Sequence, residues 1–386
     1  MKPFQMFVFI TITLGVYLLV NLFIYYQTRV VFSIPRWGIL LKIIFLALVL
    51  AYPVGRGLEA IFDGNTFTPL VRIGSMWLGA MLYLFMAFLV VWIVVVSTHT
   101  FGSANPIHAR QVGVALVYAL VSILLIVGYT NAITPIVRKI EVRVDKPLRG
   151  GKLRVVAVSD IHLGTVIGKR DLAKLVKMAN AQNPDVVLLV GDIFDEDVTP
   201  VINGGMGTLL EQFKSKYGVF AVTGNHEFYG GFEQKIKYLQ QHGVKLLRDS
   251  TVLVDSSFYI IGRDDRQSSY MLKRERKSVE ELISEVDLRK LTILLDHQPY
   301  NLDDAARCGV DLQLSGHTHN GQLWPFNYIT KAMYEVSHGY YQKGGTHYYV
   351  SSGFGTWGPR LKIGNRSEVM VVEITGNPQN STPEAS

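Results

Sequence analysis

Residues 153–162, LRVVAVSDIH, decide the fold, because an apolar run there ends in Asp160 and His162. The run is rich in Val, which predicts a strand, and the polar residues at its end mark where that strand stops. The next segment, 169–182, places apolar residues at helical spacing among charged ones. A strand followed by an amphipathic helix is typical of α/β domains.

The same combination of strand and helix recurs along the rest of the chain. The sequence predicts strands at 185–190 and 217–223, which are followed by helices near 202–214 and 232–242. Later elements are expected in the order strand 258–262, helix 278–287, strand 291–296, a short helix after Pro299, and strands 311–315, 346–351 and 368–374. The polar tail GNPQNSTPEAS (376–386) is predicted to be disordered.

Five of these strands end in residues whose side chains can bind a metal. In chain order, the strand ends are Asp160-Ile161-His162, Gly191-Asp192, Gly224-Asn225-His226-Glu227, Asp296-His297 and Gly316-His317-Thr318-His319. Any one of these residues by itself is more simply explained as a turn, a helix cap or a structural histidine. Together they predict a site, because the carboxyl ends of strands in an open α/β sheet line the ligand-binding edge.

The residue types at these strand ends indicate a pair of divalent metals. Imidazole, carboxylate and amide groups without a thiolate suit Mn, Fe, Zn, Co or Mg ions. The single cysteine, Cys308, lies outside these strand ends and says nothing about the redox compartment. Two ions about 3.5–4 Å apart can clamp a phosphoryl group if one carboxylate bridges them. Asp192 is the expected bridge, because Gly191 before it allows the backbone to turn sharply.

The stretch SGHTHNGQ (315–322) contains two histidines, His317 and His319, only two positions apart. We expect this stretch to be extended, so that His317 and His319 point to the same side and Thr318 points away. Both imidazoles would then face the metals.

The first third of the chain has a different composition from the rest. Its four apolar runs, at 7–26, 37–55, 74–97 and 112–130, are each long enough to cross a bilayer as a helix, which takes about 20 residues. The alternative is burial of all four inside a soluble protein, and Trp and Tyr near several run ends favour membrane helices. The first run lacks a cleavage site of small residues, so we interpret it as a retained helix and not as a signal peptide.

Four spans would leave the N-terminus and the C-terminal domain on one side of an inner membrane, and the distribution of basic residues favours the cytoplasmic side. The basic residues on that side are Lys2, Arg56, Arg72, Arg138, Lys139, Arg143, Lys146 and Arg149, against Arg29, Arg36, Lys42 and Arg110 on the other. The five from Arg138 onward could equally form a basic collar for anionic lipid. They account for part of the formal charge of +7, and no basic stripe with interleaved aromatic residues indicates a nucleic-acid polymer as partner.

In this order, the motifs D-x-H, GD, GNHE, a separate His and GHTH resemble the signature of the calcineurin-like metallophosphoesterases. The segment SGFGTWGPRLKIGNRSE (352–368) is similar to the tail of bacterial membrane-associated members. The resemblance covers residues 150–375 and implies a four-layer αββα sandwich, in which two mixed sheets are flanked by helices. The expected order is a four-helix transmembrane region (1–131), a basic juxtamembrane linker with an edge strand (132–152) and the metallophosphoesterase domain (153–375).

The resemblance also implies a role for each motif residue. One divalent ion would be held by Asp160, His162, Asp192 and His319, and the other by Asp192, Asn225, His297 and His317, with Mn as the favoured metal. His226 would not be a ligand; it would orient the phosphate or protonate the leaving oxygen, and Glu227 would pair with it and hold its protonated form. The implied reaction is in-line attack of a metal-bound hydroxide on a phosphoryl group.

A hydrolytic site held near the lipid headgroups by four membrane helices favours an amphiphilic phosphate as substrate, with membrane lipids as partners. The resemblance supplies acyl-sugar nucleotide diphosphates, phospholipids and polyprenyl phosphates as examples. One alternative is an enzyme that acts on soluble nucleotides or phosphoproteins. Another is a non-catalytic scaffold, although a scaffold would be expected to have lost metal ligands that this chain retains.

Two further features of the sequence bear on the substrate. The stretch LWPFNYI (323–329) is apolar and aromatic, which is consistent with contact to the membrane interface or an acyl chain, or with ordinary core packing. Arg263 and Arg360 are candidate phosphate anchors, because an Arg fork suits phosphate oxygens, but either could be a surface residue.

Overall fold

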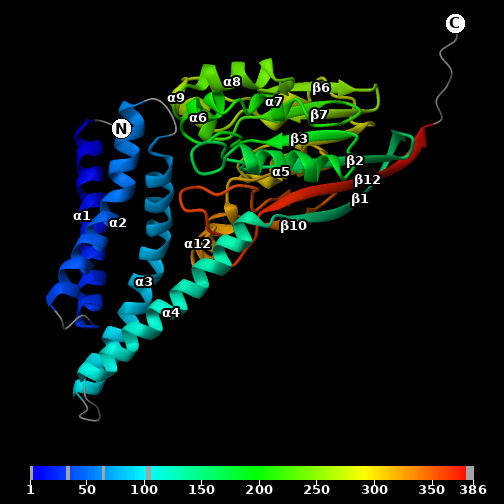
Figure 1. Ribbon diagram of the computed structural model, residues 1–386. Helices are drawn as coiled ribbons and strands as arrows, with labels where there is room; N and C mark the ends of the chain where they lie inside the picture. The colour runs from blue at the N-terminus through cyan, green and yellow to red at the C-terminus, as the bar shows by residue number, and fades with distance from the viewer. Residues whose placement is uncertain (1–2, 32–34, 63–65, 101–105, 380–386) are drawn as a thin grey trace, which may run out of the picture. The chain divides into compact units, whose positions relative to one another are not determined.

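The computed structural model describes residues 3–31, 35–62, 66–100 and 106–379 (Figure 1). The chain divides into two compact units. The first consists of Met1–Tyr129 with the short segment Gly358–Leu361, and the second consists of Thr130–Trp357 with Lys362–Ser386.

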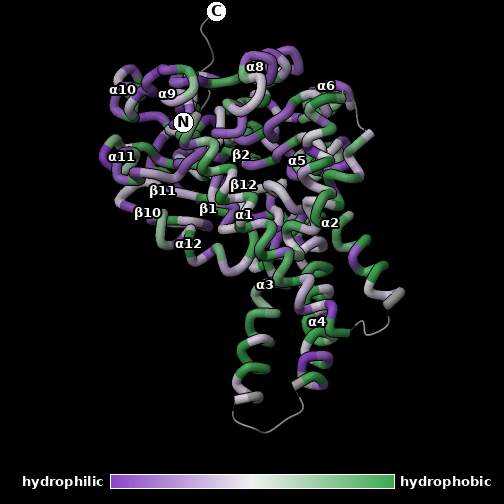
Figure 2. Tube along the Cα trace, turned by 90° about the vertical axis from the view of Figure 1, so that its left-hand side faces the viewer, coloured by the Kyte–Doolittle hydropathy of each residue, from purple (hydrophilic) through white to green (hydrophobic). Residues whose placement is uncertain are grey.

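The first unit is built from four long helices, namely α1 (Pro3–Thr28), α2 (Pro35–Ile61), α3 (Thr68–Thr100) and α4 (Pro106–Ile133), with a 3-10 turn η1 (Arg29–Val31) after the first. All four contain a span long and apolar enough to cross a membrane. Hydrophobic residues dominate each helix (Figure 2). Many of their large apolar side chains, such as Leu19, Ile43 and Leu116, are exposed. Such exposure suits lipid contact and contradicts burial inside a soluble protein.

The second unit contains two mixed sheets of six strands each. The first sheet has the order β1 (Ile136–Arg149), β12 (Glu368–Gln379), β2 (Lys152–Val158), β3 (Val186–Val190), β4 (Val219–Val222) and β5 (Val244–Leu246). The second has the order β10 (Gly339–Lys343), β11 (Thr346–Val350), β9 (Leu312–Ser315), β8 (Leu291–Leu295), β7 (Phe258–Gly262) and β6 (Ser250–Val254). Strands β2 to β5 run parallel in the first sheet, as do β7, β8, β9 and β11 in the second.

The sheets pack face to face and are covered by helices on their outer faces. The apolar core between them joins Val155 and Phe220 of the first sheet to Ile293 and Leu314 of the second. Outside the first sheet pack α5 (Lys169–Asn180) and α8 (Phe232–Gln241), and outside the second pack α10 (Val279–Ile283) and α11 (Leu302–Arg307). The remaining short helices are α6 (Thr199–Asn203), α7 (Gly207–Leu210), α9 (Gln267–Met271), α12 (Phe326–Met333) and the 3-10 turns η2 (His226–Phe228) and η3 (His319–Gly321). The predicted four-layer αββα fold is confirmed.

Several element boundaries differ from those expected. The helix predicted near 202–214 is two short helices, because Gly205 has φ +58° and ends α6. Strand β1 fills most of the segment 132–152, in which an edge strand was expected, and it runs alongside β12, which continues to Gln379 (Figure 1). Residues 376–379 of the predicted disordered tail are therefore strand, and Leu148 of β1 is buried opposite them. Residues 380–386 lie outside the described residues.

The basic residues expected as a membrane collar are distributed along β1. Three of them form ion pairs within the second unit: Arg138 with Glu368 at 3.6 Å, Lys146 with Asp311 at 2.7 Å, and Arg149 with Asp255 at 2.7 Å. A strand of this length extends over roughly 45 Å at about 3.3 Å per residue, so these charges cannot form one compact ring. Much of this basic cluster holds the edge strand to the domain.

Candidate metal centre

The predicted metal ligands come from the carboxyl ends of five strands that belong to both sheets. Asp160 and His162 follow β2, Asp192 follows β3, and Asn225 follows β4, all in the first sheet. In the second sheet, His297 follows β8, and the pair at 317 and 319 follows β9. The ligand-binding edge is therefore shared by two packed sheets and is not the edge of a single open sheet.

Five of the predicted ligands have left-handed backbone conformations, with φ of 51° at Asp160, 52° at His162, 50° at Asp192, 68° at His317 and 47° at His319. Residues with a Cβ adopt this region rarely, at a cost of about 1–3 kcal/mol each. Such strain is found where the surrounding structure enforces it, most often at functional sites.

The stretch around His317 is a turn, so the extended geometry expected for it is wrong. Thr318 has φ −74° and ψ −22°, and the histidines on either side of it are left-handed. The Thr318 hydroxyl donates to the Ser337 carbonyl at 2.6 Å and accepts from the Asn320 N–H, which holds the turn closed. The two imidazoles are consequently directed to two different groups of side chains.

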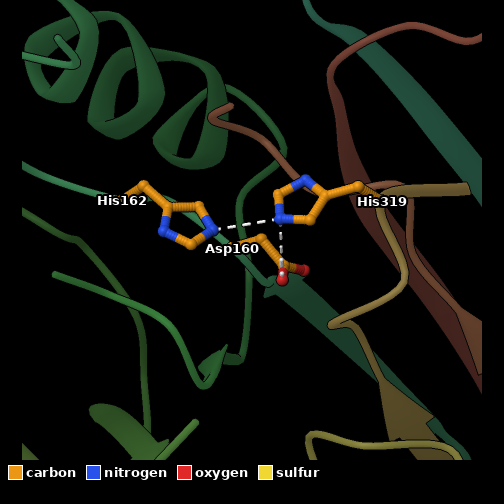
Figure 3. Close-up of side chains that lie close together, drawn as sticks. All are labelled: Asp160, His162 and His319. Carbon is orange, nitrogen blue, oxygen red and sulfur yellow. Dashed lines mark hydrogen bonds and ion pairs between the residues drawn. The ribbon is translucent and has the colours of Figure 1, made fainter. Parts of the chain in front are cut away.

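The first group consists of Asp160, His162 and His319 (Figure 3). The Nε2 atoms of the two imidazoles are 3.0 Å apart, and the His319 Nε2 is 3.5 Å from the Asp160 Oδ1. The rings are stacked, with centroids 5.0 Å apart. Three ligand atoms thus converge within 4.8 Å of one another, at the place where the first ion is expected.

The second group consists of Asp192, His297 and His317, whose ligand atoms also lie within 4.8 Å of one another. The His297 Nδ1 is 2.7 Å from the Val190 carbonyl, to which it can only donate, so its Nε2 is left as the metal-binding atom. That Nε2 lies 3.1 Å from the Asp192 Oδ2, which is also 3.9 Å from the His162 Nε2. Asp192 therefore reaches both groups, as a bridging carboxylate must.

Buried atoms without hydrogen-bond partners gather at this site. They include the Asp160 Oδ2, the Asn225 Oδ1 and the His297 Nε2. A buried acceptor with no donor is costly unless a cation or another donor satisfies it. These side chains, with no thiolate among them, fit a pair of divalent ions.

Three of the four predicted imidazole ligands are held neutral, whereas Asp192 and Asp160 outweigh burial and raise the pKa of the fourth, His297, above its usual value. Burial and the neighbouring His226 lower the pKa of His162 well below its usual value. Burial and Lys362 lower the pKa of His319 to about 3, and burial together with His297 lowers the pKa of His317 to about 4. Neutral imidazole is the form that binds a metal, so these rings are ready at neutral pH.

Two glycines allow the strand ends to approach one another. Gly191 has φ +77°, and a Cβ there would lie 2.6 Å from the His297 Nδ1, so the expected sharp turn before Asp192 is present. A Cβ on Gly224 would overlap the Asp192 Oδ1. The close approach of β3, β4 and β8 at this edge therefore requires glycine at both positions.

His226 lies beside the first group, and its ligand atom lies within 4.8 Å of those of His162 and Asp195. Its ring packs edge-on against His162, with centroids 4.5 Å apart, and its backbone N–H donates to the Asp192 Oδ1 at 2.8 Å. Its Nδ1 lies 3.4 Å from the Oδ1 of Asp195. Burial lowers the pKa of His226, but Asp195 and Asp192 outweigh burial and raise it above the usual value.

Asp195 was not among the predicted site residues. It follows Asp192 by three positions in GDIFD, so its only sequence signal is a second acid in the same loop. It takes the part that was expected of Glu227, because its carboxylate contacts the His226 ring and favours the protonated imidazole.

The expected pairing of Glu227 with the His226 ring is wrong. The Glu227 carboxylate is fully buried and accepts hydrogen bonds from four backbone N–H groups, those of Asp192, Ile193, Phe194 and Gly224, at 2.7–3.0 Å. Both carboxylate oxygens are thereby occupied. Glu227 ties the loop after β3 to the loop after β4 and so positions the bridging carboxylate.

Two buried lysines support the site and had no sequence signal of their own. The Lys235 ammonium donates to the carbonyls of Asp195 and His226, each at 2.7 Å. The Lys362 ammonium donates to the carbonyls of residues 352–353 at 2.6 Å, and burial lowers its pKa to about 8. Lys235 thus holds the carbonyl of the predicted site residue His226, and a local pattern of charged residues reveals the contacts of neither lysine.

The two candidate phosphate anchors, Arg263 and Arg360, have different surroundings. Arg263 is buried, and its guanidinium donates to the Asp296 Oδ2 at 3.1 Å and to the Lys277 carbonyl at 3.0 Å. These contacts make it a structural residue, so its assignment as an anchor is wrong. Arg360 belongs to the first unit, where its guanidinium lies 5.9 Å from the centroid of the Tyr129 ring.

Comparison with known proteins bears on the same residues. The family model described as calcineurin-like phosphoesterase matches residues 153–321, which include every predicted ligand. Over 264 residues, the chain is 36% identical to an uncharacterized metallophosphoesterase of Campylobacter jejuni, a match that covers 66% of this chain and 67% of that protein. Over 242 residues, it is 31% identical to an uncharacterized metallophosphoesterase of Aquifex aeolicus, covering 62% of this chain and 92% of that protein.

A similar protein also exists in a vertebrate. The chain is 33% identical over 273 residues to a protein of Danio rerio named transmembrane protein with metallophosphoesterase domain. This match covers 67% of the chain and 62% of the fish protein.

Proposed function

This chain belongs to the calcineurin-like phosphoesterase family and is a metal-dependent phosphoester hydrolase, and we propose that it cleaves a phosphoester or diphosphate bond of an amphiphilic substrate at a membrane surface. The observation that carries the chemistry is the position of Asp192 between two groups of histidine and carboxylate ligands. The observation that supports the substrate class is the set of four membrane-capable helices in the same chain.

The site residues divide into ligands and supporting groups. Asp160, His162, Asp192 and His319 would hold one ion, and Asp192, Asn225, His297 and His317 the other. When bound, a pair of divalent ions neutralises charge on the phosphoryl oxygens and lowers the pKa of a water molecule. The choice among Mn, Fe, Zn, Co and Mg, with Mn favoured, is part of the proposal.

The protein's own proton donor is His226. Asp195 favours its protonated form, so the imidazolium can donate a proton to the leaving oxygen as the phosphoester bond breaks. The backbone N–H of His226 donates to the Asp192 Oδ1, which fixes the position of His226 relative to the bridging carboxylate. Glu227 acts through the two loops that it ties together.

The membrane helices determine which phosphates the site meets. Helix α4 ends at Ile133 and β1 begins at Ile136, so only Thr134 and Pro135 separate a membrane-capable helix from the catalytic unit. Such a short connection ties the start of β1 to a membrane-capable helix, which favours a substrate found near the headgroups. Phospholipids, lipid-linked diphosphates and acyl-sugar nucleotide diphosphates are the candidate substrates, and the distribution of basic residues favours the cytoplasmic face of an inner membrane.

The proposal is tested with the purified full-length protein in detergent. Metal content is measured together with hydrolysis of an aryl phosphodiester, a soluble nucleotide, a phospholipid and a lipid-linked diphosphate. We expect about two divalent ions per chain, as the family's two-metal chemistry requires, and a clear preference for an amphiphilic substrate. If the soluble nucleotide is turned over as fast as the amphiphilic substrates, or faster, the alternative is favoured, namely an enzyme that acts on soluble nucleotides or phosphoproteins. Protease access to the C-terminus in sealed vesicles tests the cytoplasmic placement separately.

A further inference from the structure

Helix α12 presents an apolar surface that the described residues leave exposed. None of its residues is buried, and its large side chains include Phe326, Tyr328 (62% exposed), Ile329 (55%) and Met333 (59%). Trp324, just before the helix, is also exposed. Ordinary core packing, one of the two interpretations of LWPFNYI, is therefore wrong for this part of the stretch. Exposed apolar residues gathered on one short element indicate a surface that contacts something else.

The α12 surface directly follows a metal-binding loop. The 3-10 turn that contains His319 ends at Gly321, and the backbone of Asn327 in α12 lies so close to Gly321 that a Cβ could not fit there. The side chain of Asn365 donates to the His319 carbonyl at 2.6 Å, which holds the same turn from the other side. The apolar surface is thus fixed next to a ligand of the first ion.

A chain of hydrogen bonds connects α12 to the end of membrane-capable helix α4. The Trp324 N–H donates to the Ile363 carbonyl at 2.8 Å. One residue before Ile363, the carbonyl of Lys362 accepts from the side chain of Asn131 in the last turns of α4, at 3.2 Å. The Ser367 hydroxyl donates to the carbonyl of the neighbouring Ala132 at 2.9 Å. All these residues belong to the second unit, so their arrangement does not depend on how the two units are placed.

This connection locates α12 relative to the bilayer. The membrane-capable span of α4 runs from Arg110 to Ile133, so Asn131 and Ala132 belong to the end of that span. The segment 362–367 binds both of them and so lies beside that end of the span, and Trp324 is bound to that segment.

We propose that α12 and Trp324 rest in the interfacial layer of the bilayer that holds α1–α4, with Phe326, Ile329 and Met333 among the upper acyl chains. The composition suits that layer, because Trp and Tyr are enriched at membrane interfaces and the exposed Lys331 can extend to the headgroups. Contact with lipid beside His319 would let a lipid phosphate reach the metal centre without leaving the membrane. That last consequence rests on the proposed function, whereas the lipid contact does not.

Lipid contact is measured with the full-length protein in nanodiscs. The buried Cys308 is replaced by Ser, Ile329 is replaced by Cys and labelled with the fluorophore NBD, and the discs contain phospholipid brominated in its acyl chains. The matched control is a label at Leu253, an exposed apolar residue (41%) on strand β6. We expect strong quenching at position 329 and little at position 253. Equal quenching at the two positions overturns the proposal, as does a blue-shifted but unquenched label at 329, which would mean that a protein surface covers α12.

Delivery of the substrate is measured with paired substitutions. One double variant carries Phe326→Gln and Met333→Gln. The control double variant carries Leu253→Gln and Leu288→Gln, since Leu288 is also exposed and apolar. We expect the α12 pair to lose several-fold more hydrolysis of bilayer-embedded substrate than of a soluble aryl phosphodiester, and the control pair to lose neither. A loss that is equal for both substrates, or no loss, overturns the delivery role. Because quenching requires no turnover, a failure of the proposed function leaves the measurement of lipid contact intact.

Discussion

The Nε2 atoms of His162 and His319 lie 3.0 Å apart, and both rings are buried. Their Nδ1 atoms have no hydrogen-bond partner. Two neutral imidazoles held in this way can share one proton between the facing Nε2 atoms. A cation beside Asp160 would take the place of that proton and bind both Nε2 atoms, with the remaining proton of each neutral ring on its Nδ1, which explains why two basic rings are brought so close in the interior.

Asp192→Asn is expected to lose bound metal and activity together, because the amide carries no charge and cannot bridge two cations. Metal content by mass spectrometry and turnover on the same sample check this. Asp145→Asn, an exposed acid on β1, is the matched control and should retain both. A variant at 192 that is replete with metal and fully active would contradict the assignment of the bridge.

His226→Ala is expected to lower kcat by about 10²–10⁴-fold while metal content stays nearly unchanged, because the variant removes a proton donor and no ligand. The loss should be smaller for an aryl phosphate, whose leaving group needs little protonation. His347→Ala, a half-buried histidine on β11, serves as the control. Loss of metal equal to that of the Asp192 variant would show instead that His226 is a ligand.

Asp195→Asn is expected to move the alkaline limb of kcat/KM to lower pH. Burial lowers the pKa of His226, but Asp195 and Asp192 together raise it above its usual value, so His226 remains protonated to higher pH than an ordinary histidine. Removing the Asp195 charge lowers that pKa, and the proton donor is then lost at a lower pH. The pH profile of Asp197→Asn, in the same loop, should be that of the parent. An unshifted alkaline limb in the Asp195 variant would show that this carboxylate does not raise the pKa of the proton donor His226.

Glu227→Gln is expected to lower the free energy of unfolding by about 1–3 kcal/mol, because an amide NH₂ replaces an oxygen that accepts backbone N–H groups in the interior. Thermal unfolding in detergent measures the change, and metal affinity should fall with it, since the loop after β3 loosens. Glu233→Gln, exposed on α8, is the control. Because the Glu227 charge also raises the pKa of His226, the alkaline limb should move slightly to lower pH, by less than in the Asp195 variant. A shift as large as that of the Asp195 variant would restore the expected pairing with the His226 ring.

Much of the centre could be predicted from the strand ends. Asp160, Asp192 and His297 each follow an apolar run, and the parallel strand order brings such positions to one edge. The left-handed conformation of His317 and His319 could not be predicted, because the Thr318 hydroxyl that closes this turn bonds to a carbonyl 19 residues away. The i, i+2 rule holds for extended backbone only.

The hydrogen-bond partners of Glu227 could not be predicted from local patterns either. Adjacency in GNHE suggested the neighbouring His226, whereas the carboxylate accepts from N–H groups that lie 33–35 residues earlier in the chain, as well as from that of Gly224. Asp195 carries no distinctive spacing, and only the fold places it against the His226 ring.

The sequence by itself determined the four membrane-capable helices, the alternation of strands and helices and the residue types of the metal centre, because hydrophobic runs and strand periodicity are local properties of the chain, whereas the αββα arrangement was implied by the family resemblance. Tertiary structure decided which carboxylate serves His226, which one ties the metal loops together, and that α12 stays exposed beside His319. These depend on contacts between segments far apart in the chain, which form only when two sheets pack and bring their strand ends to a shared edge.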